Sequence, residues 1–128
     1  MKLSLYIQRF ELKELKMNIS SHESDEVLVI KISGDLMGGT DDFDAFKDEI
    51  FEAIENDRVN VVVDLEEVRW MNSSGLSMLI TGLTTVRGSG GDLKLAHVSD
   101  KVRRPLEITK LDTVFSIYNS VDEAVNSF

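Results

Sequence analysis

The chain has 128 residues, of which 42% are hydrophobic, and it carries a net charge of −9. This length and composition favour one folded domain and argue against disorder, while the charge argues against nucleic acid or an anionic membrane as a main partner, because both require a basic footprint. The chain has no cysteine, and its two histidines, His22 and His97, lie far apart, so the sequence predicts neither a disulfide nor a metal site. No apolar run approaches the roughly 20 residues that span a bilayer, and we expect a cytoplasmic protein without direct membrane insertion.

Residues 1–16 differ in charge from the rest of the chain, because they hold four basic and two acidic residues within an acidic sequence. Met17 could be the natural start, which would make residues 1–16 an extension from upstream sequence. The alternative is an arm that docks on the acidic body or on a neighbouring subunit. Chain termini become ordered only when contacts hold them, so we expect a poorly ordered extension followed by one domain over residues 17–128.

The first half of this domain predicts strands followed by a helix. A weak β pattern covers residues 17–24, and a clear strand covers residues 27–32. Residues 35–39 predict a glycine-containing turn. A helix then begins with Thr40 as its N-cap, and its buried stripe is formed by apolar residues at helical spacing. Those residues are Phe43, Phe46, Ile50, Ala53 and Ile54.

The most informative segment lies in the middle of the chain. Residues 59–65 are mostly β-branched and predict a central strand that is covered on both faces. Residues 66–71 predict a short loop, and apolar spacing predicts a helix over residues 73–87. Ser73 and Ser74 therefore present two hydroxyls at the positive end of a helix dipole, where a phosphate would be stabilised and could accept hydrogen bonds from backbone amides.

The last third of the chain also predicts strands that alternate with helices. Residues 93–98 predict a strand, and a helix follows with Ser99 and Asp100 as its start. Pro105 predicts a kink in that helix, or a helix that begins near Arg104 instead. A short strand over residues 115–118 and a helix over residues 121–128, capped by Ser120, complete the pattern.

Strands and helices alternate from residue 27 onward, and this order predicts an α/β fold. We expect a single domain with a mostly parallel sheet of four or five strands, helices packed on it, and right-handed crossovers.

These residues give little support for an enzymatic function. Neither serine lies in a G-x-S-x-G motif, and a triad of a serine with His97 and Asp64 would need a larger scaffold and an oxyanion hole that the sequence does not show. The glycine runs do not match a phosphate-binding loop. We therefore expect neither an enzyme nor a cofactor. A purely structural role for Ser73 and Ser74, as helix caps, remains the simplest alternative.

The ordered set of features resembles the STAS domain, the family of bacterial anti-sigma factor antagonists and sulfate transporter tails. Residues 61–65 followed by residues 72–76 are similar to its most specific motif, an apolar strand leading to Asp-Ser-Ser/Thr-Gly. Residues 34–36 are similar to the second strand and turn of the family. The resemblance extends over about residues 17–128 and implies the STAS fold.

The resemblance also implies an anti-sigma factor antagonist in a partner switch. Unphosphorylated at Ser73, the protein would bind an anti-sigma factor that is also a serine kinase and thereby release the sigma factor. The kinase would phosphorylate Ser73, with Ser74 as the fallback acceptor, and a metal-dependent serine phosphatase would remove the phosphate. The expected partner surface consists of Asp35, Trp70, Met71, Asn72, Ser73, Ser74, Gly75 and Leu76.

One residue departs from the family pattern, because Asn72 stands where the antagonists usually have Asp. Asn caps a helix as well as Asp does, but the change removes a negative charge beside the acceptor hydroxyl. The alternative reading keeps the fold without phosphorylation: a STAS scaffold, or a subunit of a lipid-transport ATPase complex, that binds its partner constitutively through Trp70, Met71 and the helix face of residues 73–80. The sequence does not specify an oligomeric state.

Overall fold

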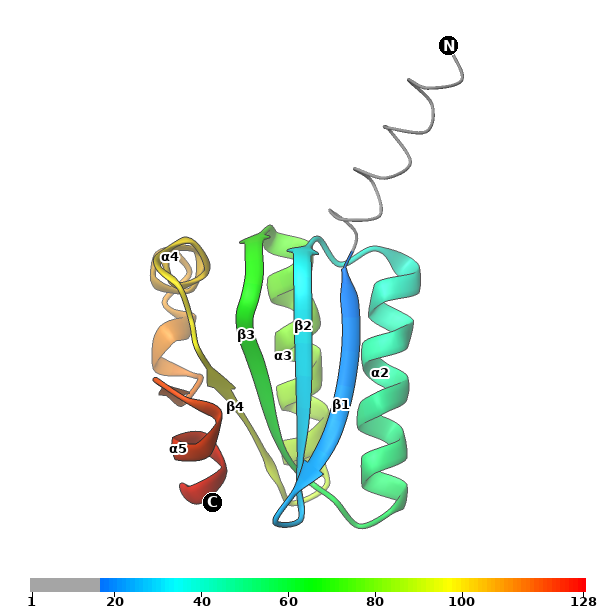
Figure 1. Cartoon of the computed structure of the whole chain (residues 1–128). Helices are drawn as coiled ribbons and strands as arrows, with labels where there is room; N and C mark the ends of the chain where they lie inside the picture. The colour runs from blue at the N-terminus through cyan, green and yellow to red at the C-terminus, as the bar shows by residue number, and fades with distance from the viewer. Residues whose placement is uncertain (1–16) are drawn as a thin grey trace, which may run out of the picture.

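A five-stranded sheet with helices on both faces forms the body of the protein in the computed structural model, which describes residues 17–128 (Figure 1). The strands are β1 (Asn18–Ser24), β2 (Val27–Leu36), β3 (Asn60–Met71), β4 (Asp92–Ala96) and β5 (Ile117–Tyr118), and they lie in this order across the sheet. The helices are α2 (Thr40–Glu55), α3 (Ser73–Gly88), α4 (Asp100–Ile108) and α5 (Val121–Asn126), with a 3₁₀ turn η1 (Leu111–Thr113). β1 is antiparallel to β2, and the other neighbours run parallel.

The predicted single-domain, mostly parallel α/β fold is thus confirmed over the described residues. The expectation for residues 1–16 lies outside them. No helix within residues 17–128 combines the length and the apolar character that crossing a bilayer requires.

The sheet, in which β3 is the central strand, separates the hydrophobic core into two clusters of unequal size. Val61, Val63 and Leu65 pack into the larger cluster together with residues of α2, α3 and α4. Val62 points to the opposite face, because successive side chains of a strand alternate, and it packs against Ala124 of α5 in a smaller cluster. All four β3 side chains are fully buried, so the prediction of a strand covered on both faces is confirmed.

Two strands extend further than the sequence predicted. β2 continues to Leu36 and β3 continues to Met71, so a turn beginning at Asp35 and a loop over residues 66–71 are wrong. Register shifts between β2 and β3 allow the two strands to stay paired through polar residues. The ladder ends with Leu36 opposite Met71. β-Bulges of this kind interrupt the period-two pattern from which strands are recognised, which explains why the extension was missed.

Several helix boundaries also differ from the prediction. Gly39, and not Thr40, is the N-cap of α2. α4 begins at Asp100 with Pro105 inside it, so a helix that begins near Arg104 is wrong. β4 ends at Ala96, two residues before the predicted end. The predicted cap of α5 is confirmed, because the Ser120 hydroxyl accepts a hydrogen bond from the amide of residue 123 at 3.1 Å.

The carboxyl ends of β2 and β3 lie at the same end of the sheet, where α2 and α3 begin (Figure 1). In parallel α/β sheets this is the end at which ligands and partners are usually bound, because the connecting loops and helix starts gather there. The serine-containing segment predicted to carry the function lies at this end.

Candidate functional site

The segment between β3 and α3 is fixed by backbone and side-chain hydrogen bonds. The amide of Asn72 donates to the carbonyl of Leu36 at 3.2 Å, which ties the segment to the end of β2. The Asn72 side chain caps α3, because its Oδ1 accepts a hydrogen bond from the amide of Gly75 at 2.8 Å. The capping function expected at this position is therefore performed by Asn72, and Ser73 and Ser74 are free of it.

Ser73 and Ser74 form the exposed first residues of α3. The first turn of α3 contains no acidic residue, so no side chain of the helix offsets the partial positive charge that its first amides carry. Both serines are exposed residues, and a phosphate added here would lie where the helix dipole is favourable to it. The structure therefore confirms both expectations on which the reading of Ser73 depended: an exposed residue and a helix that starts there.

Close packing of two loops holds this helix start in place. A Cβ atom added at Gly75 would lie 2.0 Å from the carbonyl oxygen of Leu36, so only glycine fits between α3 and the end of β2. Gly38 has a φ of +68°, and a Cβ atom there would lie 2.5 Å from the carbonyl of Ser74. The turn after β2 thus lies directly against Ser74 and Gly75 at the start of α3. The site is a preformed surface of two adjoining loops.

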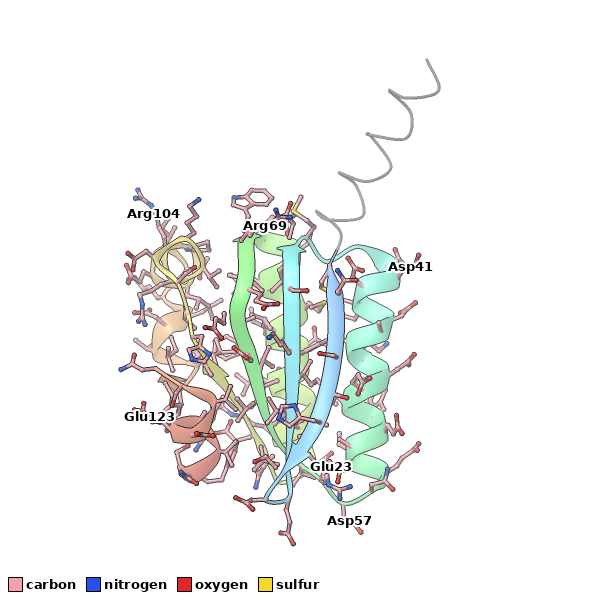
Figure 2. The ribbon with its side chains drawn as sticks, viewed as in Figure 1. Glu23, Asp41, Asp57, Arg69, Arg104 and Glu123 are labelled. Atoms are coloured by element: carbon pink, nitrogen blue, oxygen red, sulfur yellow. The ribbon has the colours of Figure 1, made fainter. Side chains whose placement is uncertain are left out.

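Exposed apolar side chains lie on the two chain segments that adjoin the serines. Trp70, at the end of β3, is 48% exposed, and Met37, in the turn after β2, is 41% exposed. Arg69 Nε, on β3, lies 3.9 Å from Asp35 Oδ1, on β2. Figure 2 shows Arg69 and Arg104 at the end of the molecule where α3 begins. An exposed tryptophan beside polar and basic groups has the composition of a protein-binding surface.

Three residues of the expected partner surface are buried in this conformation. Met71 is 2% exposed, Leu76 is 4% exposed, and Gly75 is sealed against Leu36. Met71 and Leu76 belong to the main hydrophobic core, because Met71 ends a strand and Leu76 lies on the inner face of α3. The accessible part of the predicted surface consists of the remaining residues, which are Asp35, Trp70, Asn72, Ser73 and Ser74.

The structure brings Asp64 and His97 together but leaves the serines apart from them. His97 Nδ1 lies 2.9 Å from Asp64 Oδ1. Asp64 lies seven residues before the end of β3, which corresponds to roughly 20 Å of extended strand before the start of α3. A hydrolase triad with Ser73 is therefore not assembled, and this geometry favours a binding surface over a nucleophilic active site.

Sequence reasoning missed the contribution of the turn after β2. The sequence predicts only a glycine-containing turn over residues 35–39, whereas the structure shows that Gly38 is required by its close approach to Ser74. Met37 has no periodic neighbour in sequence, so only the structure shows that it is exposed near the end of β2. A pair of glycines that follows a buried strand was the available signal for such a close approach.

Comparisons with known proteins agree with this fold. The sequence model of the STAS domain family matches residues 18–124. The anti-sigma F factor antagonist of Paenibacillus polymyxa is 25% identical over 107 residues, which cover 83% of this chain and 90% of that protein. The anti-sigma-B factor antagonist of Staphylococcus aureus is 26% identical over 108 residues, covering 80% of this chain and 94% of that protein. The solved structure of the anti-sigma factor antagonist SpoIIAA in its unphosphorylated form superimposes with a TM-score of 0.73 at 19% identity, covering 86% of this chain and 95% of that one.

Proposed function

Because this chain belongs to the STAS domain family, we propose that it acts as an anti-sigma factor antagonist in a phosphorylation-controlled partner switch. In this proposal the unphosphorylated protein binds an anti-sigma factor kinase in the cytoplasm, and phosphorylation of Ser73 ends the binding. A serine phosphatase then restores the binding form. The protein is a regulator in this scheme, and the chemistry is performed by its partners.

The observation that carries the proposal is the exposed residue Ser73 at the first position of α3. A kinase can reach a hydroxyl in this position without unfolding the domain. The resulting phosphate adds about −1.5 to −2 charges and three acceptor oxygens. The amides at the helix start tolerate this group, whereas a partner packed against Trp70 and Ser73 would have to desolvate it.

The proposed acceptor is tested by incubating the protein with ATP and its cognate anti-sigma factor kinase, followed by mass spectrometry. We expect a single added phosphate on Ser73, and no modification of the Ser73→Ala variant. Ser74→Ala is the matched control, because Ser74 is also an exposed residue on the same helix turn, and it should be modified like the wild type. An unmodified wild-type protein, or unchanged modification of Ser73→Ala, would reject Ser73 as the acceptor.

A constitutive STAS scaffold, including a subunit of a lipid-transport ATPase complex, is the second candidate function. The observation that favours it is Asn72, which caps α3 through a neutral side chain where the switching antagonists usually have a carboxylate. In such a scaffold, the surface around Trp70 would bind a partner regardless of phosphorylation. The two candidates differ in one result, because only the switch predicts that a negative charge at position 73 abolishes binding.

Both candidates predict that Trp70 anchors the partner. Trp70→Ala should weaken partner binding by about 2 kcal/mol, roughly thirtyfold, because exposed tryptophans at interfaces are frequent hot spots. Phe51→Ala is a matched control, since Phe51 is an aromatic residue of similar exposure, 46% against 48%, in the C-terminal half of α2. Isothermal titration calorimetry with the partner would measure both. Equal affinities for the Trp70→Ala variant and the wild type would place the interface elsewhere.

A further inference from the structure

A cluster of three potential metal ligands lies away from the serine surface, on the sheet face that α5 partly covers. It consists of Asp64, Glu66 and His97, whose ligand atoms all lie within 4.8 Å of one another. Asp64 lies two residues after Val62 on β3 and shares its face, that of the α5 cluster. We propose that this cluster is a binding site for a divalent transition-metal ion such as Zn²⁺.

The backbone places the imidazole ring against the two carboxylates. Asp64 is paired in register with Ala96, the last residue of β4, and His97 follows directly. A regular strand would direct His97 to the opposite face. Instead, His97 adopts a left-handed backbone with φ of +56°, and its ring turns toward Asp64. The backbone amide of His97 donates to the carbonyl of Tyr118 at 3.1 Å, which fixes this turn to β5.

The two distances from the His97 ring to the carboxylates lie near those of a tetrahedral site. His97 Nδ1 lies 2.9 Å from Asp64 Oδ1 and 3.7 Å from Glu66 Oε2. Two ligands bound to Zn²⁺ at about 2.0–2.2 Å in tetrahedral geometry are about 3.3 Å apart, and the two observed distances bracket this value. The ion would replace the proton between Nδ1 and Oδ1, since a neutral imidazole can carry its proton on Nε2. One imidazole and two carboxylates leave one position for water.

The charge around the cluster also favours a cation. The Asp64 side chain is only 10% exposed, and its Oδ1 accepts a hydrogen bond from the amide of Glu66 at 3.1 Å in addition to its contact with His97. Lys31 lies opposite Asp64 in the register of β2 and β3, but its ammonium group pairs with Glu67 at 3.3 Å. Glu66 is more exposed, at 61%, and its flexible side chain can adjust to the coordination distance. A buried carboxylate, an adaptable carboxylate and a fixed imidazole thus converge on one point.

The site is tested by titrating the metal-free protein with ZnCl₂ in a calorimeter and with CoCl₂ in a spectrophotometer. We expect one saturable site in the wild type, with the visible absorption of tetrahedral Co²⁺. His97→Ala and Glu66→Gln should each lower the affinity for Zn²⁺ at least about tenfold, as loss of a directly coordinating group exceeds the effect of an outer-shell change. Glu66→Gln keeps the test valid if His97→Ala folds poorly, because Glu66 is exposed.

Two variants serve as controls for nonspecific binding. His22→Ala removes the other histidine of the chain, and Glu67→Gln removes the neighbouring carboxylate; both should bind Zn²⁺ like the wild type. The inference is overturned if the wild type shows no saturable binding, or if binding is lost in His22→Ala and retained in His97→Ala. The outcome is independent of phosphorylation at Ser73, because Asp64 lies roughly 20 Å along β3 from that residue.

Discussion

The Ser73→Asp variant is expected to bind the anti-sigma factor kinase more than about a hundredfold more weakly than the wild type, a loss of about 3 kcal/mol. Ser73 is exposed at the start of α3, three residues after the exposed Trp70, and in the proposed complex the docked partner covers the new carboxylate. Covering a charge without a compensating partner is unfavourable. Calorimetric titration of the kinase into each form of the antagonist measures the effect.

The Ser73→Asp substitution should not lower the stability of the folded protein. A loss of binding by this variant can then be attributed to the interface and not to misfolding. A carboxylate at the first position of a helix is favoured by the dipole, by about 0.3–1 kcal/mol, and α3 has no acidic residue there. Urea denaturation of Ser73→Asp should therefore give an unfolding free energy equal to or above that of the wild type. Lost binding together with retained stability would support the switch.

A charge elsewhere on α3 provides the matched control. Ser89 is an exposed serine at the opposite end of the helix, about 24 Å away for a helix of 16 residues. Ser89→Asp adds the same charge to the protein and should bind the kinase like the wild type. Unchanged binding by Ser73→Asp would reject the switch and favour the constitutive scaffold.

The sequence predicted the fold because its local signals agree with one another. The valines of β3 form an uninterrupted buried run, and the apolar residues of α3 follow helical spacing, so the pattern identified both elements. The prediction of strand ends failed where irregular strand pairing interrupts the sequence pattern. The bulges between β2 and β3 extend both strands through polar residues, which periodicity cannot register.

The candidate site was predictable in part for the same reason. Ser73 and Ser74 could be placed at a helix start from residue types and spacing alone. The burial of Met71 could not be foreseen, because the residue was assigned to a loop and it ends a strand. The cluster of Asp64, Glu66 and His97 was also inaccessible to spacing rules, because His97 lies 33 residues after Asp64 in the sequence and meets it only through the register of β3 and β4.

Gly75→Ala should produce the largest loss of stability near the site, lowering the free energy of unfolding by about 2 kcal/mol. Helix propensity alone predicts the opposite sign, because Ala is preferred to Gly inside a helix by about 1 kcal/mol. The added Cβ atom, however, would lie 2.0 Å from the carbonyl oxygen of Leu36, which is backbone and cannot rotate away. Urea denaturation monitored by circular dichroism would measure the change.

Gly88→Ala isolates the packing effect from propensity, because Gly88 is in the same helix and nothing lies within 4 Å of a Cβ atom added there. This variant should be more stable than the wild type by about 0.5–1 kcal/mol. Opposite signs for the two substitutions would show that close packing against β2 fixes the start of α3. Relief of the Gly75→Ala clash requires α3 to move away from β2, which strains the hydrogen bond from Asn72 to Leu36 and displaces Ser73. If Gly75→Ala were as stable as the wild type, the helix start would be adaptable, and a preformed surface around Ser73 would no longer explain partner binding.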